Sequence, residues 1–384
     1  MNERVYLDHN ATSPPSPEVV EAVARALADE FGNASSIHSY GQRAKAALDD
    51  ARTEVARLIG AEPGDLVFTG SGTEADNLAL RGVADAQAPS RTRLIVTSVE
   101  HEAVINTARA LGRRGTPVTI LPVDADGVVR PSAFEEALGD DVALVSVMLA
   151  NNETGAIQPV GRLASLARAR RVVFHTDAVQ AVGKIPVDVL ALGVDLLSLS
   201  AHKFGGPKGA GALWIRRGTP LSGVMTGGRQ ERNRRAGTEN VPAIVGLGIA
   251  ARLSRTRLVE ESARQAGLRD RLETGILERV RGTAVNGAGA SRVPNTTNVA
   301  FERVDAESLL MALDLEGIAV STGAACSSGT LEPSHVLRAM GLPHGRVQSS
   351  LRFSVGVTTT REEVDRVLAV LPAIVTRLRA VGRR

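Results

Sequence analysis

The sequence predicts an α/β protein: a mostly parallel central sheet with helices on both faces, followed by a smaller α+β unit toward the C-terminus. Up to residue 215, short runs rich in Val, Ile and Leu alternate with amphipathic stretches of helix length. These apolar runs lack strict alternation, which is typical of strands that are buried on both faces. Repeated strand–helix alternation favours a parallel sheet, and the change of pattern after residue 215 indicates the second unit.

The elements of the large unit follow from these runs. The expected strands are residues 66–69, 93–98, 142–147, 172–176, 195–200 and 212–215. The expected helices are residues 18–30, 42–59, 73–84, 102–113, 131–138 and 160–170. Ser16 and Pro17 supply an N-cap and a proline at the first helical position for the first helix, and Gly32 ends it.

The second unit begins after a Gly- and Arg-rich stretch at residues 223–237 and includes part of a long helical run at 241–280. A linker at 286–295 follows, and the remaining expected elements are strands at 297–301, 318–321 and 351–356 and helices at 306–315, 333–340 and 362–381. We therefore expect an N-terminal segment (1–15) that packs with the small domain, a large domain (16–255) and a small C-terminal domain (256–384).

Composition excludes several classes of protein. No apolar run approaches the ~20 residues that a membrane-spanning helix needs, and residues 1–10 lack the apolar core of a secretory signal. The single cysteine cannot form an internal disulfide, which fits a cytoplasmic protein. Only four of the 45 basic residues are lysines and aromatic residues make up 3%. The pI of 9.4 therefore reflects arginine usage, and no direct nucleic-acid binding is expected.

Two glycine-rich turns follow expected strands, where ligands bind in open α/β sheets. In the turn at 70–73, the start of a helix and the Thr73 hydroxyl would fit a phosphate, although a tight connection without a ligand is the alternative. In the turn at 198–211, Lys203 comes directly after a buried strand. A desolvated lysine there fits Schiff-base chemistry with an aldehyde, and a structural lysine paired with a carboxylate is the alternative.

Asp177 and His101 also follow expected strands. The histidines form no HxxxH pair and the chain has no CxxC, so Asp177 has no obvious partners for a metal site. A buried Asp near an aldehyde-bearing lysine suits a pyridinium nitrogen, which it would keep protonated so that the ring can accept electrons. His101 could stack on such a ring or donate a proton, and a purely structural histidine is the alternative.

Six short motifs occur in a specific order along the chain. They are residues 71–74 (SGTE), 100–104 (EHEAV), 151–155 (NNETG), 175–180 (HTDAVQ), 200–203 (SAHK) and 235–240 (RAGTEN). In these motifs the chain resembles the cysteine desulfurases, which are pyridoxal-phosphate (PLP) enzymes of the aspartate-aminotransferase fold (fold type I). The resemblance extends from Tyr6 to the last helix.

The resemblance implies a PLP site. Lys203 would bind the PLP aldehyde as an imine and remove the substrate's Cα proton, Asp177 would pair with the pyridine nitrogen, and Gln180 would contact the phenolic oxygen. His101 would stack on the ring and handle the proton of the substrate thiol. The other residues that the resemblance assigns to the cofactor are Gly72, Thr73, Asn151, Ser200, His202 and, from the second subunit of a homodimer, Thr238.

The resemblance also implies a substrate site. Arg352 would bind the carboxylate of L-cysteine, because the guanidinium fork matches a carboxylate. The residues that would assist it are Asn10, Ala11, Thr12, Asn33 and Asn151. The chain departs from the family pattern at Ala34, where proline is frequent, and at Arg229 and Asn233, where glycines are common.

Cys326 is the only cysteine and lies in a Gly/Ser/Ala-rich stretch at 321–329. A free cysteine is most often a small buried apolar residue, whereas this composition indicates an exposed loop. In the family, this residue takes the sulfur of L-cysteine as a persulfide and alanine leaves. The stretch is most similar to the iron–sulfur-assembly and nitrogen-fixation type. The resemblance implies a sulfur-acceptor protein such as an iron–sulfur scaffold, with Cys326 as a possible transient ligand of a [2Fe-2S] cluster shared with it.

Two alternatives stay open at the level of sequence. One is a PLP-dependent aminotransferase, cysteine β-lyase or selenocysteine lyase of the same fold, in which Cys326 is incidental, because fold alone does not separate these activities. The other is a non-enzymic binding protein with glycine-rich turns.

Overall fold

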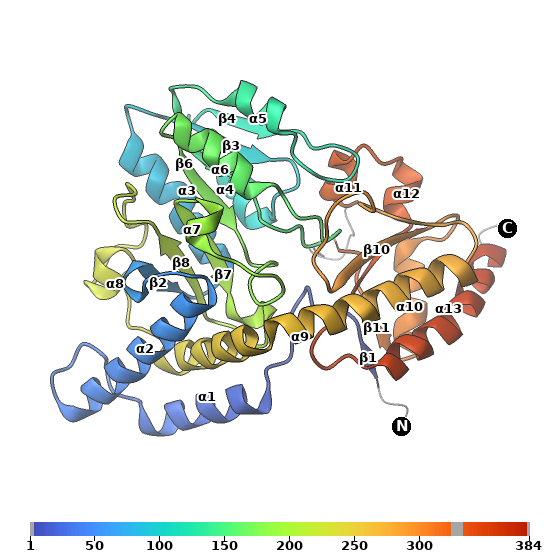
Figure 1. Ribbon diagram of the computed structural model, residues 1–384, viewed down its shortest axis with the longest axis horizontal. Helices are drawn as coiled ribbons and strands as arrows, with labels where there is room; N and C mark the ends of the chain where they lie inside the picture. Colours follow the sequence, from blue (N-terminus) through green and yellow to red (C-terminus); the bar gives the residue numbers. More distant parts are fainter. Residues whose placement is uncertain (1–3, 324–332, 382–384) are drawn as a thin grey trace.

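A seven-stranded sheet and a three-stranded sheet, connected by one long helix, organise the chain (Figure 1). The computed structural model describes residues 4–323 and 333–381. The large sheet lies with its helices on one side of the molecule, and the C-terminal elements form the other side.

The central sheet has the strand order β2-β8-β7-β6-β5-β3-β4. Its strands are β2 (Leu66–Thr69), β3 (Arg93–Thr97), β4 (Val118–Leu121), β5 (Val142–Ser146), β6 (Val173–Asp177), β7 (Leu196–Ser200) and β8 (Gly211–Ile215). β8 is antiparallel to both of its neighbours, β2 and β7, and all the other neighbouring pairs are parallel. This confirms a mostly parallel sheet with all six expected strands. The unexpected strand, β4, is a half-exposed edge strand flanked by Pro117 and Pro122, so its sequence lacks the buried-strand pattern.

Helices cover both faces of this sheet because each strand sends side chains to two cores. In β2, Leu66 and Phe68 lie in one core and Val67 lies in the other. The second core packs against α3 (Gly72–Gln87) and α4 (Glu102–Gly112). The helices on the opposite face are α2 (Ser39–Leu58), α5 (Pro131–Ala137), α6 (Val160–Ala169), α7 (Val189–Leu192) and the first part of α9 (Val241–Arg279).

The C-terminal elements form a separate core around an antiparallel sheet of order β12-β10-β9. The strands are β9 (Thr283–Val285), β10 (Thr296–Phe301) and β12 (Ser350–Ser354), and α10 (Ala306–Leu315) and α13 (Arg361–Val381) contribute to this core. The short helices α11 (His335–Ala339) and α12 (His344–Gln348) instead form a small cluster with Val99 and Met148. The N-terminal strand β1 (Val5–Tyr6) pairs with β11 (Ile318–Ala319), so the N-terminus packs on this side. The remaining elements are α1 (Pro17–Asp29), α8 (Gln230–Asn233) and the short 3-10 turns η1 (Pro63–Asp65) and η2 (Ala201–Lys203).

Helix α9 contributes to both cores. Leu247 and Ala251 lie in the large core, whereas Leu268 and Leu272 lie in the small one. The division into residues 1–15, 16–255 and 256–384, with a boundary inside this helix, stays a prediction.

None of the helices in the described part of the chain combines the length and the apolar composition that a bilayer crossing requires.

Packing of α2 against α9 gives the first testable prediction. A Cβ on Gly248 would lie 2.6 Å from Ala51 Cα, so Gly248→Ala should push the two helices apart and destabilise the fold by about 1–3 kcal/mol. Gly267, in the same helix, has open space around it, so Gly267→Ala should stabilise by up to about 1 kcal/mol. Urea unfolding measures both variants, and equal stabilities would contradict this close helix contact.

Candidate functional site

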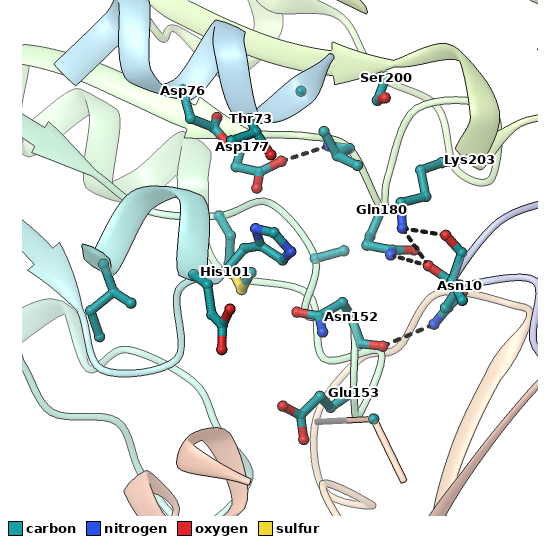
Figure 2. Close-up of a pocket in the computed structure, with 18 of the residues that line it drawn as sticks. Asn10, Thr73, Asp76, His101, Asn152, Glu153, Asp177, Gln180, Ser200 and Lys203 are labelled. Carbon is teal, nitrogen blue, oxygen red and sulfur yellow. Dashed lines mark hydrogen bonds between the residues drawn. The ribbon is translucent and has the colours of Figure 1, made fainter. Parts of the chain in front are cut away.

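A cavity of about 380 Å³ lies beyond the carboxyl ends of the central strands (Figure 2). The turns after β2, β3, β5, β6 and β7 line it, as expected for an open α/β sheet. The remaining sides are closed by residues from near the N-terminus and from the C-terminal part of the chain: Asn10, Ala11, Ser321, Gly323, Pro333, His335 and Arg352. We call this space the sheet-end cavity.

Lys203 lies in the sheet-end cavity with its amine held by backbone carbonyls. Its Nζ donates to Asn10 O at 2.7 Å and to Ala11 O at 2.8 Å (Figure 2). Burial lowers the pKa of Lys203 to about 8, and the nearby Arg352 adds to this effect, while Asp177 opposes it. A substantial fraction of neutral amine is therefore present near neutral pH, and a neutral amine is the form that attacks a carbonyl carbon.

Asp177 ends β6 and is buried at the floor of the cavity. Its Oδ1 accepts the Val179 N–H at 2.9 Å. Burial raises the pKa of Asp177, and the charges of His101 and Lys203 act in the opposite direction. A cationic group beside this carboxylate would favour its ionised form. The position thus suits the protonated nitrogen of a heterocycle.

His101 is the N-cap of α4 and lines the same cavity. Its Nδ1 accepts the Ala103 N–H at 3.1 Å, so the proton of the neutral ring lies on Nε2. Burial lowers the pKa of His101, although the Asp177 charge opposes this shift. The neutral ring can therefore stack on a flat ligand and exchange a proton at Nε2.

The residues at the start of α3 and after β7 carry groups that suit a phosphate. Gly72 and Thr73 begin α3, and Ser200 and His202 approach from β7 and the following turn. A Cβ on Gly72 would lie 2.8 Å from the Val179 side chain, so this close approach requires glycine. Burial lowers the pKa of His202 to about 4, which leaves a neutral ring. Free N–H groups and hydroxyls at a helix N-terminus stabilise a bound anion.

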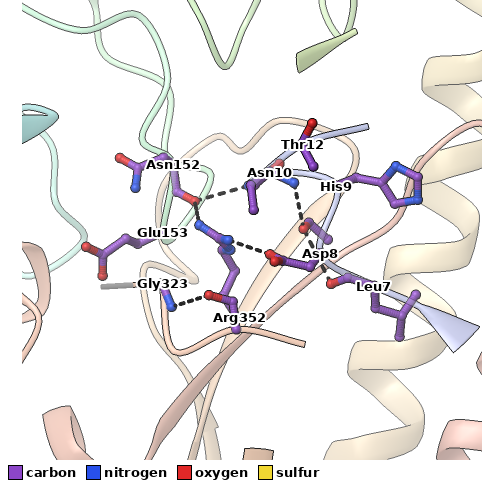
Figure 3. Close-up of polar contacts among 12 residues, drawn as sticks. Leu7, Asp8, His9, Asn10, Thr12, Asn152, Glu153, Gly323 and Arg352 are labelled. Atoms are coloured by element: carbon purple, nitrogen blue, oxygen red, sulfur yellow. Dashed lines mark hydrogen bonds and ion pairs between the residues drawn. The ribbon is translucent and has the colours of Figure 1, made fainter. Parts of the chain in front are cut away.

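Arg352 lines the cavity from β12, and Figure 3 shows it between Asp8 and Asn152. Its guanidinium donates to Asp8 Oδ1 at 2.6 Å and to Asn152 O at 3.0 Å. The buried Nε has no hydrogen-bond partner among the described residues. Arg352 lines the cavity, and a guanidinium suits a ligand carboxylate.

The structure brings several other expected residues to different places. Asn151 does not line the cavity, because its buried amide holds its own turn through Glu153 N and Thr154 N. The neighbouring Asn152 lines it instead. Asn10 does line it, but other groups of the protein occupy the donors and acceptors of its side chain.

Thr12, Asn33 and Thr238 lie outside the residues that line the cavity. Thr12 supports it indirectly, since its Oγ1 lies 3.2 Å from His202 Nδ1. Asn33 is exposed and accepts two hydrogen bonds from Ser35. Thr238 is also exposed. Cys326 lies outside the described residues.

Sequence reasoning missed three buried acids near the floor and mouth of the cavity. Asp76 has an oxygen without a hydrogen-bond partner in the described part of the chain, and burial raises its pKa well above the usual value. Burial also raises the pKa of Glu100 to about 8 and raises that of Glu153, whose Oε2 accepts from Ser334 at 2.5 Å. Glu100 lies in the motif at 100–104 and Glu153 in the motif at 151–155. The sequence alone does not show that their carboxyl groups are buried.

Arg229 and Asn233, at which the chain departs from the family pattern, lie at the two ends of α8. Asn233 has φ 64°, in the left-handed region that favours glycine and that asparagine tolerates, whereas Arg229 has an ordinary φ of −91°. Glu231 is buried in this turn, where both guanidinium nitrogens of Arg52 donate to it at 2.9 and 2.6 Å.

Comparison with known proteins agrees with this geometry. The family model Aminotransferase class-V matches residues 5–367. A protein named cysteine desulfurase IscS from Methanosarcina thermophila is 48% identical over 378 residues, covering 98% of this chain and 93% of its own. A cysteine desulfurase from Cereibacter sphaeroides is 50% identical over 382 residues, covering 99% and 98%.

Solved structures give the same result. A NifS-like protein superposes with a TM-score of 0.92 at 36% identity, covering 98% of this chain and 100% of its own. A structure described as SspA in complex with cysteine has a TM-score of 0.83 at 32% identity, covering 93% and 100%. With a family match over nearly the whole chain and relatives near half identity along their length, this chain belongs to the class-V aminotransferase family and, within it, to the cysteine desulfurases.

Proposed function

We propose that this enzyme is a PLP-dependent cysteine desulfurase that converts L-cysteine and the Cys326 thiol into L-alanine and a Cys326 persulfide. The C–S bond of the substrate breaks and an S–S bond forms at Cys326. The substrate's β-carbon keeps the electron pair of the C–S bond and gains a proton, while the sulfur is oxidised to the persulfide level. Atoms and electrons balance without an external oxidant.

The observation that carries this proposal is the placement of the Lys203 amine and the Asp177 carboxylate around one cavity. Its volume of about 380 Å³ falls within the ~300–1,000 Å³ typical of small-molecule sites. PLP is a flat aldehyde with a phosphate at one end, and the groups present fit it. Lys203 supplies the amine, Asp177 suits the pyridine nitrogen, and the start of α3 suits the phosphate.

Each residue then has a defined task. Bound PLP withdraws electrons from the Cα atom of the amino acid that it carries. Lys203 Nζ removes and returns the Cα proton, and Asp177 keeps the pyridine nitrogen protonated. Arg352, which lines the cavity from β12, orients the substrate carboxylate through its guanidinium. His101 stacks on the ring, and its Nε2 receives the proton of the substrate thiol.

Two substitutions separate this function from its alternatives. Lys203→Ala should remove the visible absorption of the cofactor-loaded protein, because the covalent link to PLP is lost. Cys326→Ala should keep that absorption and lose persulfide formation and alanine production from L-cysteine by at least about 100-fold, since the sulfur acceptor is gone. Undiminished sulfide release by Cys326→Ala would instead indicate a β-lyase, and a colourless native protein would indicate a binding protein.

The lowered pKa of Lys203 predicts a pH dependence. Only the neutral amine attacks the PLP aldehyde, so the rate of covalent attachment to the apoprotein should rise about tenfold per pH unit below 8 and level off above it. Rapid-mixing absorbance between pH 6 and 10 measures this rate. A rate that continues to rise steeply from pH 8 to 10 would indicate an ordinary lysine.

A homodimer is part of the proposal. Four large apolar side chains are exposed between the end of α1 and the start of α2, and the ring centres of two of them, Phe31 and Tyr40, lie 5.2 Å apart. They are Leu27 (63% exposed), Phe31 (67%), Ile37 (91%) and Tyr40 (48%). We call this group the α1–α2 apolar patch. A second copy of the chain would bury it, because several large apolar side chains exposed on one segment favour a protein interface. Thr238 is exposed and outside its own cavity, which suits a contact with the partner's phosphate site.

Light scattering tests the dimer. The native protein should have twice the 40.2 kDa mass of the chain, and Ile37→Arg should shift it toward the monomer because a charge would be buried without a partner. Leu315→Arg is the matched control, since Leu315 is exposed on α10 in the small domain. A native monomer that binds PLP and is active would contradict this part of the proposal.

The sulfur acceptor and the compartment follow from the same proposal. A cytoplasmic sulfur-acceptor protein, such as an iron–sulfur scaffold, would take the persulfide sulfur from Cys326, and Cys326 would serve as a transient cluster ligand in that complex. The single cysteine supports a reducing compartment, where a free thiol persists.

A further inference from the structure

Lys184 is a buried lysine beside the sheet-end cavity that the proposed mechanism does not use. It is 6% exposed. Its Nζ donates to Asn10 Oδ1 at 2.9 Å and to Gln180 Oε1 at 2.5 Å. Within the described part of the chain, no carboxylate forms an ion pair with it, so both of its hydrogen bonds go to amide oxygens.

Burying the positive charge of a lysine in this position costs folding free energy. A buried ammonium ion without a counter-charge is strongly disfavoured. Burial lowers the pKa of Lys184 well below its usual value, and the positive groups Lys203 and Arg352 act in the same direction. Two N–H groups of Lys184 point at the two amide oxygens.

The contacts of Gln180 leave its amide only one orientation. Its Nε2 donates to Asn10 O at 3.0 Å (Figure 2). A backbone carbonyl can only accept, so the nitrogen must face it, and the Lys184 amine holds the oxygen on the other side. The second Nε2 hydrogen remains for a ligand, and Gln180 lines the cavity. A flipped amide would present an oxygen there instead.

Asn10 couples this orientation to Lys203. The same Asn10 carbonyl that accepts from Gln180 also accepts from Lys203 Nζ at 2.7 Å. The side chain of Asn10 is fixed by Lys184 and by Asn295, whose Nδ2 donates to Oδ1 at 3.0 Å. Lys184 therefore contacts, directly or through Asn10, two groups that would meet the cofactor.

We propose that Lys184 is a positioning residue that keeps the N–H side of the Gln180 amide directed at the phenolic oxygen of PLP. This inference rests on the proposed function. Without the Lys184 amine, Gln180 Oε1 loses its donor in a buried place, and the amide turns or shifts to find another. The phenolic oxygen then loses its hydrogen bond or meets a second acceptor.

The test compares apoprotein variants by their affinity for PLP. Lys184→Met keeps the length of the side chain and removes the donors, and it should weaken PLP binding about tenfold, the effect of one hydrogen bond. It should also shift the absorption maximum of the bound cofactor, because the phenolic oxygen changes its environment. Lys45→Met is the matched control: Lys45 is exposed on α2, where it pairs with Asp49, and its loss should change neither quantity.

A double-mutant cycle with Gln180→Ala separates positioning from a general loss of structure. If Lys184 acts through Gln180, Lys184→Met should have little further effect on affinity in the Gln180→Ala background. Lys184→Gln, which retains an amide donor, should recover part of the affinity, and thermal unfolding of the apoproteins checks that each variant folds. Equal affinity of Lys184→Met and native protein, or additive losses in the cycle, would overturn the inference. Failure of the native apoprotein to bind PLP would instead overturn the proposed function.

Discussion

The hydrogen bonds of Asn10 are the constraint on which the geometry of the cavity depends. Its backbone carbonyl accepts from Gln180 and Lys203, and its backbone N–H donates to Ser354 Oγ. Its side chain bonds Lys184 and Asn295 through Oδ1, and Asn152 O and Thr296 Oγ1 through Nδ2. One residue of the N-terminal segment thus connects turns of the central sheet to strands of the small sheet. Both halves of the site are fixed relative to each other by that connection.

Burial shifts the titration of the cavity's ionisable groups toward their neutral forms. The pKa values of Asp76, Glu100 and Asp177 are raised, and that of Lys203 is lowered, mainly by desolvation. A ligand with a cationic nitrogen and an anionic phosphate supplies opposite charges, and these favour the ionised forms of the groups. The guanidinium of Arg352, which lines the cavity, favours a further anion. Binding a ligand with this distribution of charge therefore stabilises the ionised forms of these groups, which supports the proposed binding of PLP and an amino-acid carboxylate.

Much of the architecture could be predicted because its signals are local. Buried strands such as β5 and β7 are short, apolar runs, and helix starts such as Ser16–Pro17 are set by caps. Lys203, Asp177 and His101 follow strand ends, and parallel strands end at one edge of a sheet, so their convergence follows from order along the chain. Edge strand β4 could not be predicted in this way, because a half-exposed strand between prolines lacks the buried pattern.

By itself, the sequence determined the fold class, the lysine and aspartate of the site, and the single thiol available for sulfur chemistry. Only the tertiary structure decided which polar residues face the cavity and which support it. Asn151 and Asn152 are identical in type and adjacent, yet only Asn152 lines the cavity, because the side chain of Asn151 holds its own turn. Lys184 and Asp76 likewise look like ordinary helix or turn residues in the sequence. Their chemistry comes from burial and from partners far away in the chain, which no local pattern records.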